Sequence, residues 1–279
     1  MHFTKMQGIG NDFIMVENFK NEVQNKNNLA KKLCDRHFGI GADGLVFIEN
    51  SNIADLKMRV VNSDGSNADM CGNAIRCFSK YAYEKNIIKK DTLDIETPAG
   101  IMKAKLSVEN DMVSTVRISM GKPSYDKKLI PFNGELNNKA YSLDIGGKKY
   151  EITTLLMGVP HTVLFSGEIS DGDVIQYGRY IEKLPLYPQG TNVNFVNVID
   201  DRTISVRTWE RGAGLTLACG TGACASVAAS YLNNKTGRKV KVKLMKGELI
   251  IEQDVNGYIY MEGPASTVYE GDVSISKWF

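Results

Sequence analysis

Apolar residues recur at three- and four-residue intervals in four stretches, each of which predicts a helix. The first is residues 27–38, where Phe38 is the last position of the apolar face and Gly39 is a natural stop. The second is residues 73–88, and the third surrounds residues 174–181. The fourth, residues 221–232, is rich in alanine and serine, so we expect it to pack closely on all sides.

Between these helices, short runs of apolar and β-branched residues predict strands. A Gly-rich turn separates two of them within residues 3–18, and residues 121–149 are polar and rich in turn residues. Each half of the chain then follows one order: strands, a helix that opens with Cys-Gly, and more strands. Helices are too few for a regular strand–helix alternation, so this order favours an internal duplication over one doubly wound sheet.

The duplication gives the predicted domain boundaries. We expect an N-terminal domain of residues 1–120, joined by the returning segment 265–279, and a C-terminal domain of residues 121–264. A chain of 279 residues is long enough for two medium-sized domains.

Composition narrows the class of protein. The chain is 43% hydrophobic and 24% charged, as in soluble globular proteins, and its net charge of +2 provides no basic surface for nucleic acid or for a membrane. No stretch resembles an export signal or a membrane helix, so we expect a cytoplasmic protein whose five cysteines stay reduced. The cysteine spacings do not match a zinc site, and we expect no metal.

One motif is misleading. Residues 39–44, GIGADG, match the Gly-x-Gly-x-x-Gly pattern of dinucleotide-binding proteins. That pattern works when it follows a strand and opens a helix, whereas here it follows a helix and leads into a strand. We interpret it as a turn and expect no nicotinamide or flavin cofactor.

Two cysteines occupy positions that suggest chemistry. Cys71 and Cys219 each stand directly before a predicted helix and are each followed by glycine. The free N–H groups at a helix start can lower the pKa of a thiol from ~8.5 into the range of ~3.5–7.5. If the two helix starts faced one cleft, one thiolate and one thiol could serve a two-base racemase. A redox pair and two structural cysteines remain alternatives on the residues alone, while Cys34, Cys77 and Cys224 fit buried hydrophobic positions.

Seven motifs carry a resemblance across nearly the whole chain. They are KMQGIGNDF, HFGIGADGL, NSDGSNADMCGNAIRC, MGVPH, GTNVNF, WERGAG and LACGTGACAS. In this combination and order the chain resembles the diaminopimelate epimerases, a family of amino-acid racemases that use no cofactor. The resemblance implies an α/β (α+β) fold of two pseudo-symmetric domains, each a curved, mostly antiparallel sheet around a central helix. It also implies interconversion of LL- and meso-diaminopimelate in the cleft between the domains, for lysine and peptidoglycan synthesis.

The resemblance also assigns roles to residues. It implies that Cys71 and Cys219 are the acid/base thiols. Residues at the two helix starts would hold the reacting carboxylate, namely Gly72, Asn73, Gly220 and Thr221. Polar residues would line the reacting centre, namely Asn11, His161 and Glu210. A third group would grip the distant end of the substrate, namely Asn62, Asn192 and Arg211. Apart from the family, the two asparagines at 11 and 62 could be turn residues, the charges could be solvated, and the histidine could cap a strand.

Two positions depart from the family pattern. Val159 stands where many members have an asparagine that binds the far end of the substrate, and Gly44 replaces a polar side chain of some members. These differences bear on the range of substrates. Alternatives are a proline-type racemase, a non-catalytic binding protein of the same class and a thiol redox protein. We expect a small-molecule substrate as the partner, with a homodimer possible.

Overall fold

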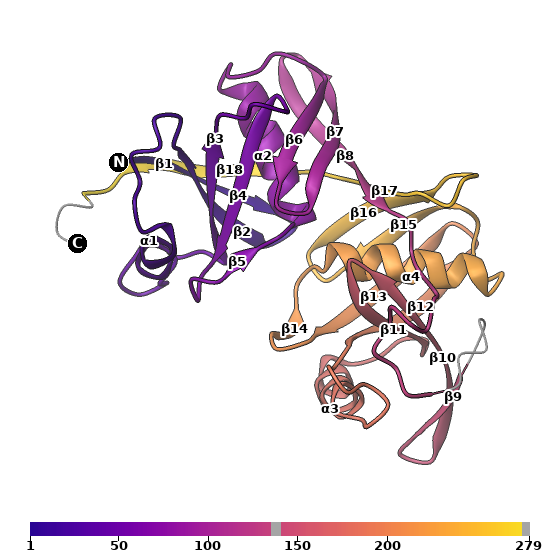
Figure 1. The fold of residues 1–279 in the computed structure, drawn as a ribbon. Coiled ribbons are helices and arrows are strands. Elements are labelled where there is room, and N and C mark those ends of the chain that lie inside the picture. The colour runs from indigo at the N-terminus through magenta and orange to yellow at the C-terminus, as the bar shows by residue number, and fades with distance from the viewer. Residues whose placement is uncertain (135–140, 275–279) are drawn as a thin grey trace. The chain divides into compact units, whose positions relative to one another are not determined.

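The structure, a computed structural model, describes residues 1–134 and 141–274 (Figure 1). The chain forms two compact units of mixed α/β class, in which strands predominate. Unit 1 comprises Met1–Ser119 and the C-terminal segment that begins at Glu262, and unit 2 comprises Met120–Met261.

Unit 1 is a curved sheet with two helices (Figure 1). Its helices are α1 (Lys26–Leu33) and α2 (Gly72–Glu84). Its strands are β1 (His2–Gly8), β2 (Asn11–Glu17), β3 (Gly44–Glu49), β4 (Leu56–Asn62), β5 (Asn67–Ala68), β6 (Thr92–Thr97), β7 (Gly100–Glu109), β8 (Met112–Gly121) and β18 (Ser266–Asp272). They pair in the order β18–β1–β2–β3–β4–β6–β7–β8, with β5 on β4, and only the β2–β3 and β4–β6 pairs are parallel.

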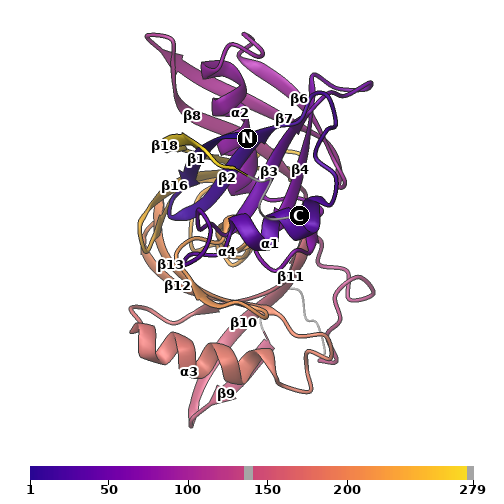
Figure 2. The same cartoon turned by 90° about the vertical axis from the view of Figure 1, so that its left-hand side faces the viewer.

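Unit 2 also contains two helices, α3 (Asp171–Glu182) and α4 (Gly220–Leu232) (Figure 2). Its strands are β9 (Tyr141–Ile145), β10 (Lys148–Met157), β11 (Val159–Phe165), β12 (Asn192–Asp200), β13 (Thr203–Glu210), β14 (Gly214–Thr216), β15 (Lys239–Leu244), β16 (Gly247–Gln253) and β17 (Ile259–Gly263). Seven of them pair in the order β9–β10–β11–β12–β13–β15–β16, with β14 on β13, and the β11–β12 and β13–β15 pairs are parallel.

The two units repeat one sequence of elements. From β1 to β8 and again from β10 to β17, the order is two strands, a helix, three strands, a helix and three strands. Parallel pairs fall at equivalent places, because β2–β3 corresponds to β11–β12 and β4–β6 to β13–β15. The predicted pseudo-symmetric α/β fold is therefore confirmed.

The second helix of each repeat is the central one. Residues 72–82 of α2 are all buried, and the helix contacts β1, β2, β3, β4 and β7 of unit 1. In α4, residues 222–230 are buried, and the helix contacts strands β10 to β13, β15 and β16 of unit 2. Small side chains allow α4 to be buried on every side without displacing the strands around it. Each central helix begins directly after Cys71 or Cys219.

Three sequence predictions require correction. The helix predicted for residues 27–38 ends at Leu33, because the Asp35 carboxylate accepts the backbone N–H groups of residues 37 and 38 and closes a turn. Phe38, placed on the buried face of that helix, is 90% exposed. The predicted helix of residues 73–88 ends at Glu84. The turn-rich segment 121–149 contains β9 and the first two residues of β10, although residues 135–140 of it lie outside the described part of the chain.

Other local predictions are confirmed. Residues 39–43 lie in the connection between α1 and β3, which begins at Gly44, and Gly41 has a φ of 80° that favours glycine. Cys34, Cys77 and Cys224 are buried, as expected of small hydrophobic side chains.

Among the residues that the structure describes, no helix is long and apolar enough to cross a membrane.

Candidate active site

Cys71 is the N-cap residue of α2 in unit 1. Its backbone is extended, with φ −142° and ψ 113°, and its side chain makes no capping hydrogen bond to the helix. The thiol is partly exposed and is directed to the Oδ1 atom of Asn11, at a sulfur–oxygen distance of 3.8 Å.

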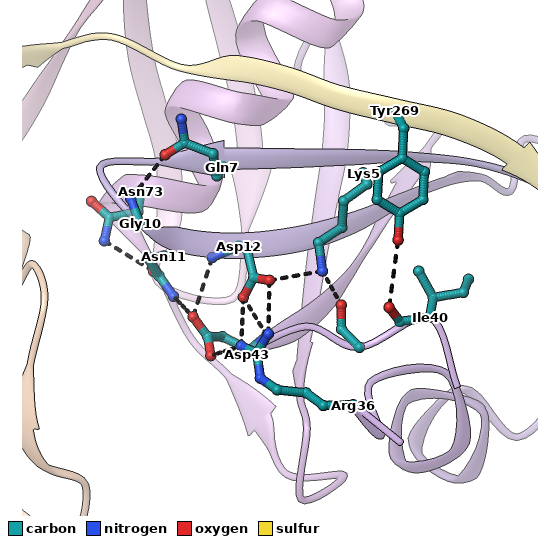
Figure 3. Close-up of polar contacts among 11 residues, drawn as sticks. Lys5, Gln7, Gly10, Asn11, Asp12, Arg36, Ile40, Asp43, Asn73 and Tyr269 are labelled. Atoms are coloured by element: carbon teal, nitrogen blue, oxygen red, sulfur yellow. Dashed lines mark hydrogen bonds and ion pairs between the residues drawn. The ribbon is translucent and has the colours of Figure 1, made fainter. Parts of the chain in front are cut away.

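The amide of Asn11 has one orientation, set by its partners (Figure 3). Its Nδ2 atom donates to the Asp43 carboxylate at 2.7 Å, and a carboxylate can only accept. The Oδ1 atom of Asn11 therefore faces Cys71 and also accepts from Nδ2 of Asn73 at 2.9 Å. Because β1 and β2 meet at the tight turn before Asn11, the chain brings this amide to the start of α2.

Asp43 belongs to a cluster of charged side chains that also contains Arg36, Asp12 and Lys5 (Figure 3). Arg36 donates to Asp43 at 2.8 Å and grips Asp12 with two hydrogen bonds of 2.8 and 3.1 Å. Lys5, almost fully buried, pairs with Asp12 at 2.7 Å and also donates to the Gly41 carbonyl. Burial alone would raise the pKa of Asp12, but the hydrogen bonds and charges of Arg36 and Lys5 outweigh it and lower the pKa to about 2.

Of the other predicted residues of unit 1, two lie at the start of α2 and one lies at the end of β4. Asn73 is 5% exposed, and its Oδ1 atom has no hydrogen-bond partner within the described residues, so an acceptor is available at the start of α2. Gly72, also buried, is the first residue of the helix. Asn62 lies at the end of β4, where its amide donates to the Ser66 hydroxyl at 2.9 Å, as the turn interpretation expects.

Cys219 is the N-cap residue of α4 in unit 2 and is 4% exposed. Unlike Cys71, it caps its own helix, since its Sγ atom accepts the N–H of Gly222 at 3.3 Å. The hydroxyl of Thr221 lies 3.5 Å from the same sulfur. Position 222 must be glycine, because a Cβ there would lie 2.4 Å from the Asn194 Oδ1 atom.

The pKa of Cys219 contradicts the sequence expectation of a lowered value. Burial raises the pKa well above 9.0, and the charge of the Glu210 carboxylate raises it further. The hydrogen bonds from Thr221 and Gly222 lower it, but they are outweighed. The helix start alone therefore does not ionise this thiol, because desolvation of the thiolate costs more than the amides return.

The remaining predicted residues of unit 2 lie on strands β11, β12 and β13 or directly after β13. Glu210, the last residue of β13, accepts from the Thr216 hydroxyl at 2.6 Å. Asn192 begins β12 opposite His161 on β11, and its Oδ1 atom accepts the backbone N–H of Arg211 at 2.8 Å. The Arg211 guanidinium donates to the carbonyl of Gln189 and is exposed.

His161 is fully buried, and its surroundings keep it neutral. Burial, together with the positive charge of Arg211, lowers the pKa of its imidazole to about 3. Its Nδ1 atom lies 3.1 Å from Nδ2 of Asn194, and its Nε2 atom has no hydrogen-bond partner among the described residues. A strand cap, the alternative for this residue, does not account for these contacts.

Each unit therefore holds a half-site at the start of its central helix. The unit 1 half-site joins Cys71, Asn73 and Asn11, while the unit 2 half-site joins Cys219 and Thr221 to Glu210. Sequence reasoning missed the residues that orient these groups, namely Asp43, Arg36, Asn194 and Thr208. Asp43 and Asn194 do lie inside two of the quoted motifs, HFGIGADGL and GTNVNF, which was the available signal.

No group of three or more His, Cys, Asp or Glu side chains within the described ranges could hold a metal ion. All five cysteines are free thiols. The half-sites thus offer thiols, amides and backbone N–H groups, which suit proton transfer and carboxylate binding.

Solved structures with a similar fold show which group of folds this chain belongs to. A solved structure of a probable proline racemase from Agrobacterium radiobacter K84 superposes with a TM-score of 0.71 over 99% of this chain and 94% of that one, at 15% identity. A PhzF-family phenazine biosynthesis protein of Bacillus anthracis gives a TM-score of 0.72 at 16% identity, over 99% of both chains. The chain thus has the fold shared by these proteins.

The family follows from the sequence. The pattern of the family described as diaminopimelate epimerase matches residues 3–125 and 153–268. The diaminopimelate epimerase of Caldanaerobacter subterraneus subsp. tengcongensis is 48% identical over 99% of this chain and all of that protein. The one of Pelotomaculum thermopropionicum is 48% identical over 98% of each. The chain belongs to the diaminopimelate epimerase family and is an isomerase.

Proposed function

We propose that this protein interconverts LL- and meso-diaminopimelate by a two-base mechanism that uses Cys71 and Cys219 and no cofactor. One observation carries the proposal: in a chain of this family, each of the two repeats places a Cys-Gly pair at the start of its buried central helix. A racemase needs two proton-transfer groups, one for each face of a carbon. The duplication supplies one group per repeat.

In the proposed mechanism the two half-sites close around one α-carbon. One thiolate takes the Cα proton, and the other thiol gives its proton to the opposite face, so the number of protons on the enzyme is unchanged. The backbone N–H groups at both helix starts bind the substrate carboxylate and stabilise the negative charge that develops beside it. After each turnover the two sulfurs have exchanged protonation states.

The environment of Cys219 suggests its role in the first turnover. Burial and Glu210 keep this thiol protonated in the free enzyme, so Cys219 starts as the proton donor. Cys71 is then the group that must lose its proton as substrate binds. The like charges of two nearby thiolates would resist full ionisation, which favours one thiolate and one thiol.

The distant end of the substrate would be held by Asn62, Asn192 and Arg211. The Oδ1 atom of Asn192 is occupied by the Arg211 N–H, which leaves its Nδ2 atom to donate to a ligand. The exposed guanidinium of Arg211 can pair with a carboxylate through two hydrogen bonds. Val159, 37% exposed, cannot form such a bond, so this end is held by fewer polar contacts than in members with asparagine there.

The product would serve the synthesis of lysine and peptidoglycan, as the family implies. Thiols that must remain reduced also agree with a reaction in the cytoplasm.

The decisive assay uses the purified protein in deuterated water, with no added cofactor. We expect LL-diaminopimelate to be converted, and solvent deuterium to enter the newly formed epimer well before it enters recovered starting material. Proline and single-centre amino acids serve as comparison substrates. Equal early labelling of both epimers would indicate one base, and conversion of proline instead would support the proline-type alternative.

Substitution of the two thiols tests their assignment. We expect Cys71→Ala and Cys219→Ala each to lower kcat by about 10³-fold, because each removes one obligatory proton-transfer group. Cys77→Ala in α2 and Cys224→Ala in α4 are matched controls, since they remove buried thiols from the same two helices. Folding is checked by circular dichroism. Near-normal turnover in either of the first two variants would refute the assignment.

A further inference from the structure

Three buried polar side chains of unit 2 form a relay that ends at His161. Thr208, Asn194 and His161 lie on β13, β12 and β11, and they are 3%, 0% and 0% exposed. Thr208 and Asn194 are directly opposite each other in the β12–β13 register. The Thr208 hydroxyl donates to Oδ1 of Asn194 at 3.0 Å, and Nδ2 of Asn194 lies 3.1 Å from Nδ1 of His161.

A backbone carbonyl decides which way the Asn194 amide points. The Nδ2 atom lies 3.4 Å from the carbonyl oxygen of Thr162, and a carbonyl oxygen can only accept. A rotated amide would place its oxygen against the Thr162 carbonyl oxygen, and neither of these two acceptors could donate to the other. The hydroxyl of Thr208 can donate, so it satisfies Oδ1 in the observed orientation.

The orientation of the amide fixes the tautomer of the histidine. Because Nδ2 of Asn194 is a donor, Nδ1 of His161 must accept, and in a neutral imidazole the proton then resides on Nε2. That Nε2–H group is buried, and no described residue accepts from it. A buried donor without a partner destabilises the protein, and a ligand that accepts a hydrogen bond from it would recover that loss.

We propose that Asn194, aligned by Thr208 and the Thr162 carbonyl, is a positioning residue that holds His161 as the neutral Nε2–H tautomer, so that His161 offers the substrate an uncharged hydrogen-bond donor. The role in the reaction rests on the proposed function, whereas the tautomer rests on the geometry alone. A neutral imidazole can polarise an acceptor without delivering a full charge to the site.

The relay lies against the helix start that carries Cys219. A Cβ at position 222 would lie 2.4 Å from Oδ1 of Asn194 and 3.1 Å from both the Thr208 hydroxyl and the Cys219 sulfur. Asn194, Thr208 and the Cys219 thiol therefore all border the space beside the Cα atom of Gly222. Arg211, the charged group that acts on His161, opposes protonation of the imidazole together with burial.

Nitrogen NMR of the histidine ring tests the proposal directly. The chain has three histidines, so a His2→Gln, His37→Gln variant labelled with ¹⁵N-histidine reports only His161. We expect a protonated Nε2 and an unprotonated Nδ1, unchanged between pH 5 and pH 9. A proton on Nδ1, or on both nitrogens at pH 7, would overturn the proposal without any need for a relay variant.

Asn194→Asp is the informative substitution. A carboxylate beside Nδ1 can only accept, so the proton should move to Nδ1 and the two ring signals should exchange character. We expect kcat to fall by about 10²-fold with a smaller change in KM, because the group that remains is wrongly protonated. Thr208→Ser, which retains the hydroxyl, should keep the wild-type tautomer and rate, while Thr208→Val should lower the rate.

The two readouts separate this inference from the proposed function. If the wild-type protein epimerises diaminopimelate but carries the proton on Nδ1, the inference fails alone. If it has the expected tautomer and does not act on diaminopimelate, the proposed function fails and the assigned tautomer stands. Unchanged ring signals in Asn194→Asp would show that Asn194 does not set the tautomer.

Discussion

The two cysteines occupy equivalent positions but meet different partners. Cys71 is partly exposed and faces the oxygen of an amide, whereas Cys219 is buried and accepts a backbone N–H. The Glu210 carboxylate adds a negative charge beside Cys219. The repeat therefore conserves where each thiol stands along its helix, while side chains from other strands set how readily it ionises.

Removing that charge should make Cys219 easier to ionise. In a Cys71→Ser background, we expect Glu210→Gln to lower the pKa of Cys219, because the carboxylate opposes a neighbouring thiolate. Alkylation by iodoacetamide at pH 8 should then be faster, since only the thiolate reacts. Glu210→Asp, which retains the charge, is the control. A slower or unchanged alkylation of Glu210→Gln relative to this control would contradict the electrostatic account.

The sequence could name these side chains but not their environments. Family motifs brought Asn11, His161 and Glu210 into view. The orientation of Asn11 depends on Asp43, which is 32 residues away, and the neutral state of His161 depends on complete burial. The expected drop in the pKa of Cys219 failed for the same reason, because the helix start is a local feature whereas desolvation comes from the whole unit.

At the scale of elements, the beginnings of the central helices were predicted to within one residue. The Cys-Gly pair gave that signal, because in each repeat the cysteine is the extended N-cap residue and the glycine is the first residue of the helix. Helix ends were less predictable. The apolar pattern that continued to Phe38 was followed by a turn closed by Asp35, and such side-chain hydrogen bonds override a weak periodicity.

Two glycines in the first turns of helices allow a matched test of this packing. Gly222→Ala in α4 should destabilise unit 2, because its Cβ would lie 2.4 Å from Asn194 Oδ1 and force the relay or Cys219 to move. Gly172→Ala in α3 has only the Ser170 hydroxyl at 3.7 Å and should stabilise the protein, by up to about 1 kcal/mol. Urea unfolding measures both. Equal stability of the two variants would show that position 222 has room for a side chain.

At the scale of the whole molecule, the two units share one order of elements, but the side chains next to their half-sites differ in charge. Unit 1 places a cluster of charged side chains behind its half-site, with Asp12 between Arg36 and Lys5. Unit 2 places neutral, buried polar groups there, with His161 at their end. The repeated order could be predicted from strand and helix patterns, whereas this division could not, since it depends on which side chains meet across strands far apart in sequence.

The buried histidine makes the stability of unit 2 sensitive to mild acid. The pKa of His161 is about 3 in the folded protein, whereas the ordinary pKa of histidine is 6.5. Between these two pH values the unfolded chain binds a proton that the folded protein does not, so stability falls as the pH falls below 6.5. Between pH 7 and pH 5 this amounts to about 2 kcal/mol of unfolding free energy. Asp12, with a folded pKa of about 2 against 3.8, acts only below that window, because it is ionised in both states at pH 5.

Tryptophan fluorescence can isolate this effect, since Trp209 is the only tryptophan left after Trp278→Phe. In that background, urea unfolding at pH 7 and pH 5 should show the loss, and His161→Gln should remove most of it whatever its own stability at pH 7. The comparison uses a difference between two pH values for each variant, so the cost of the substitution itself cancels. His37→Gln removes an exposed histidine and should retain the full loss. If His161→Gln lost as much stability as the parent, another group would have to bind the proton on unfolding, and a neutral, buried His161 would no longer explain how the protein responds to acid.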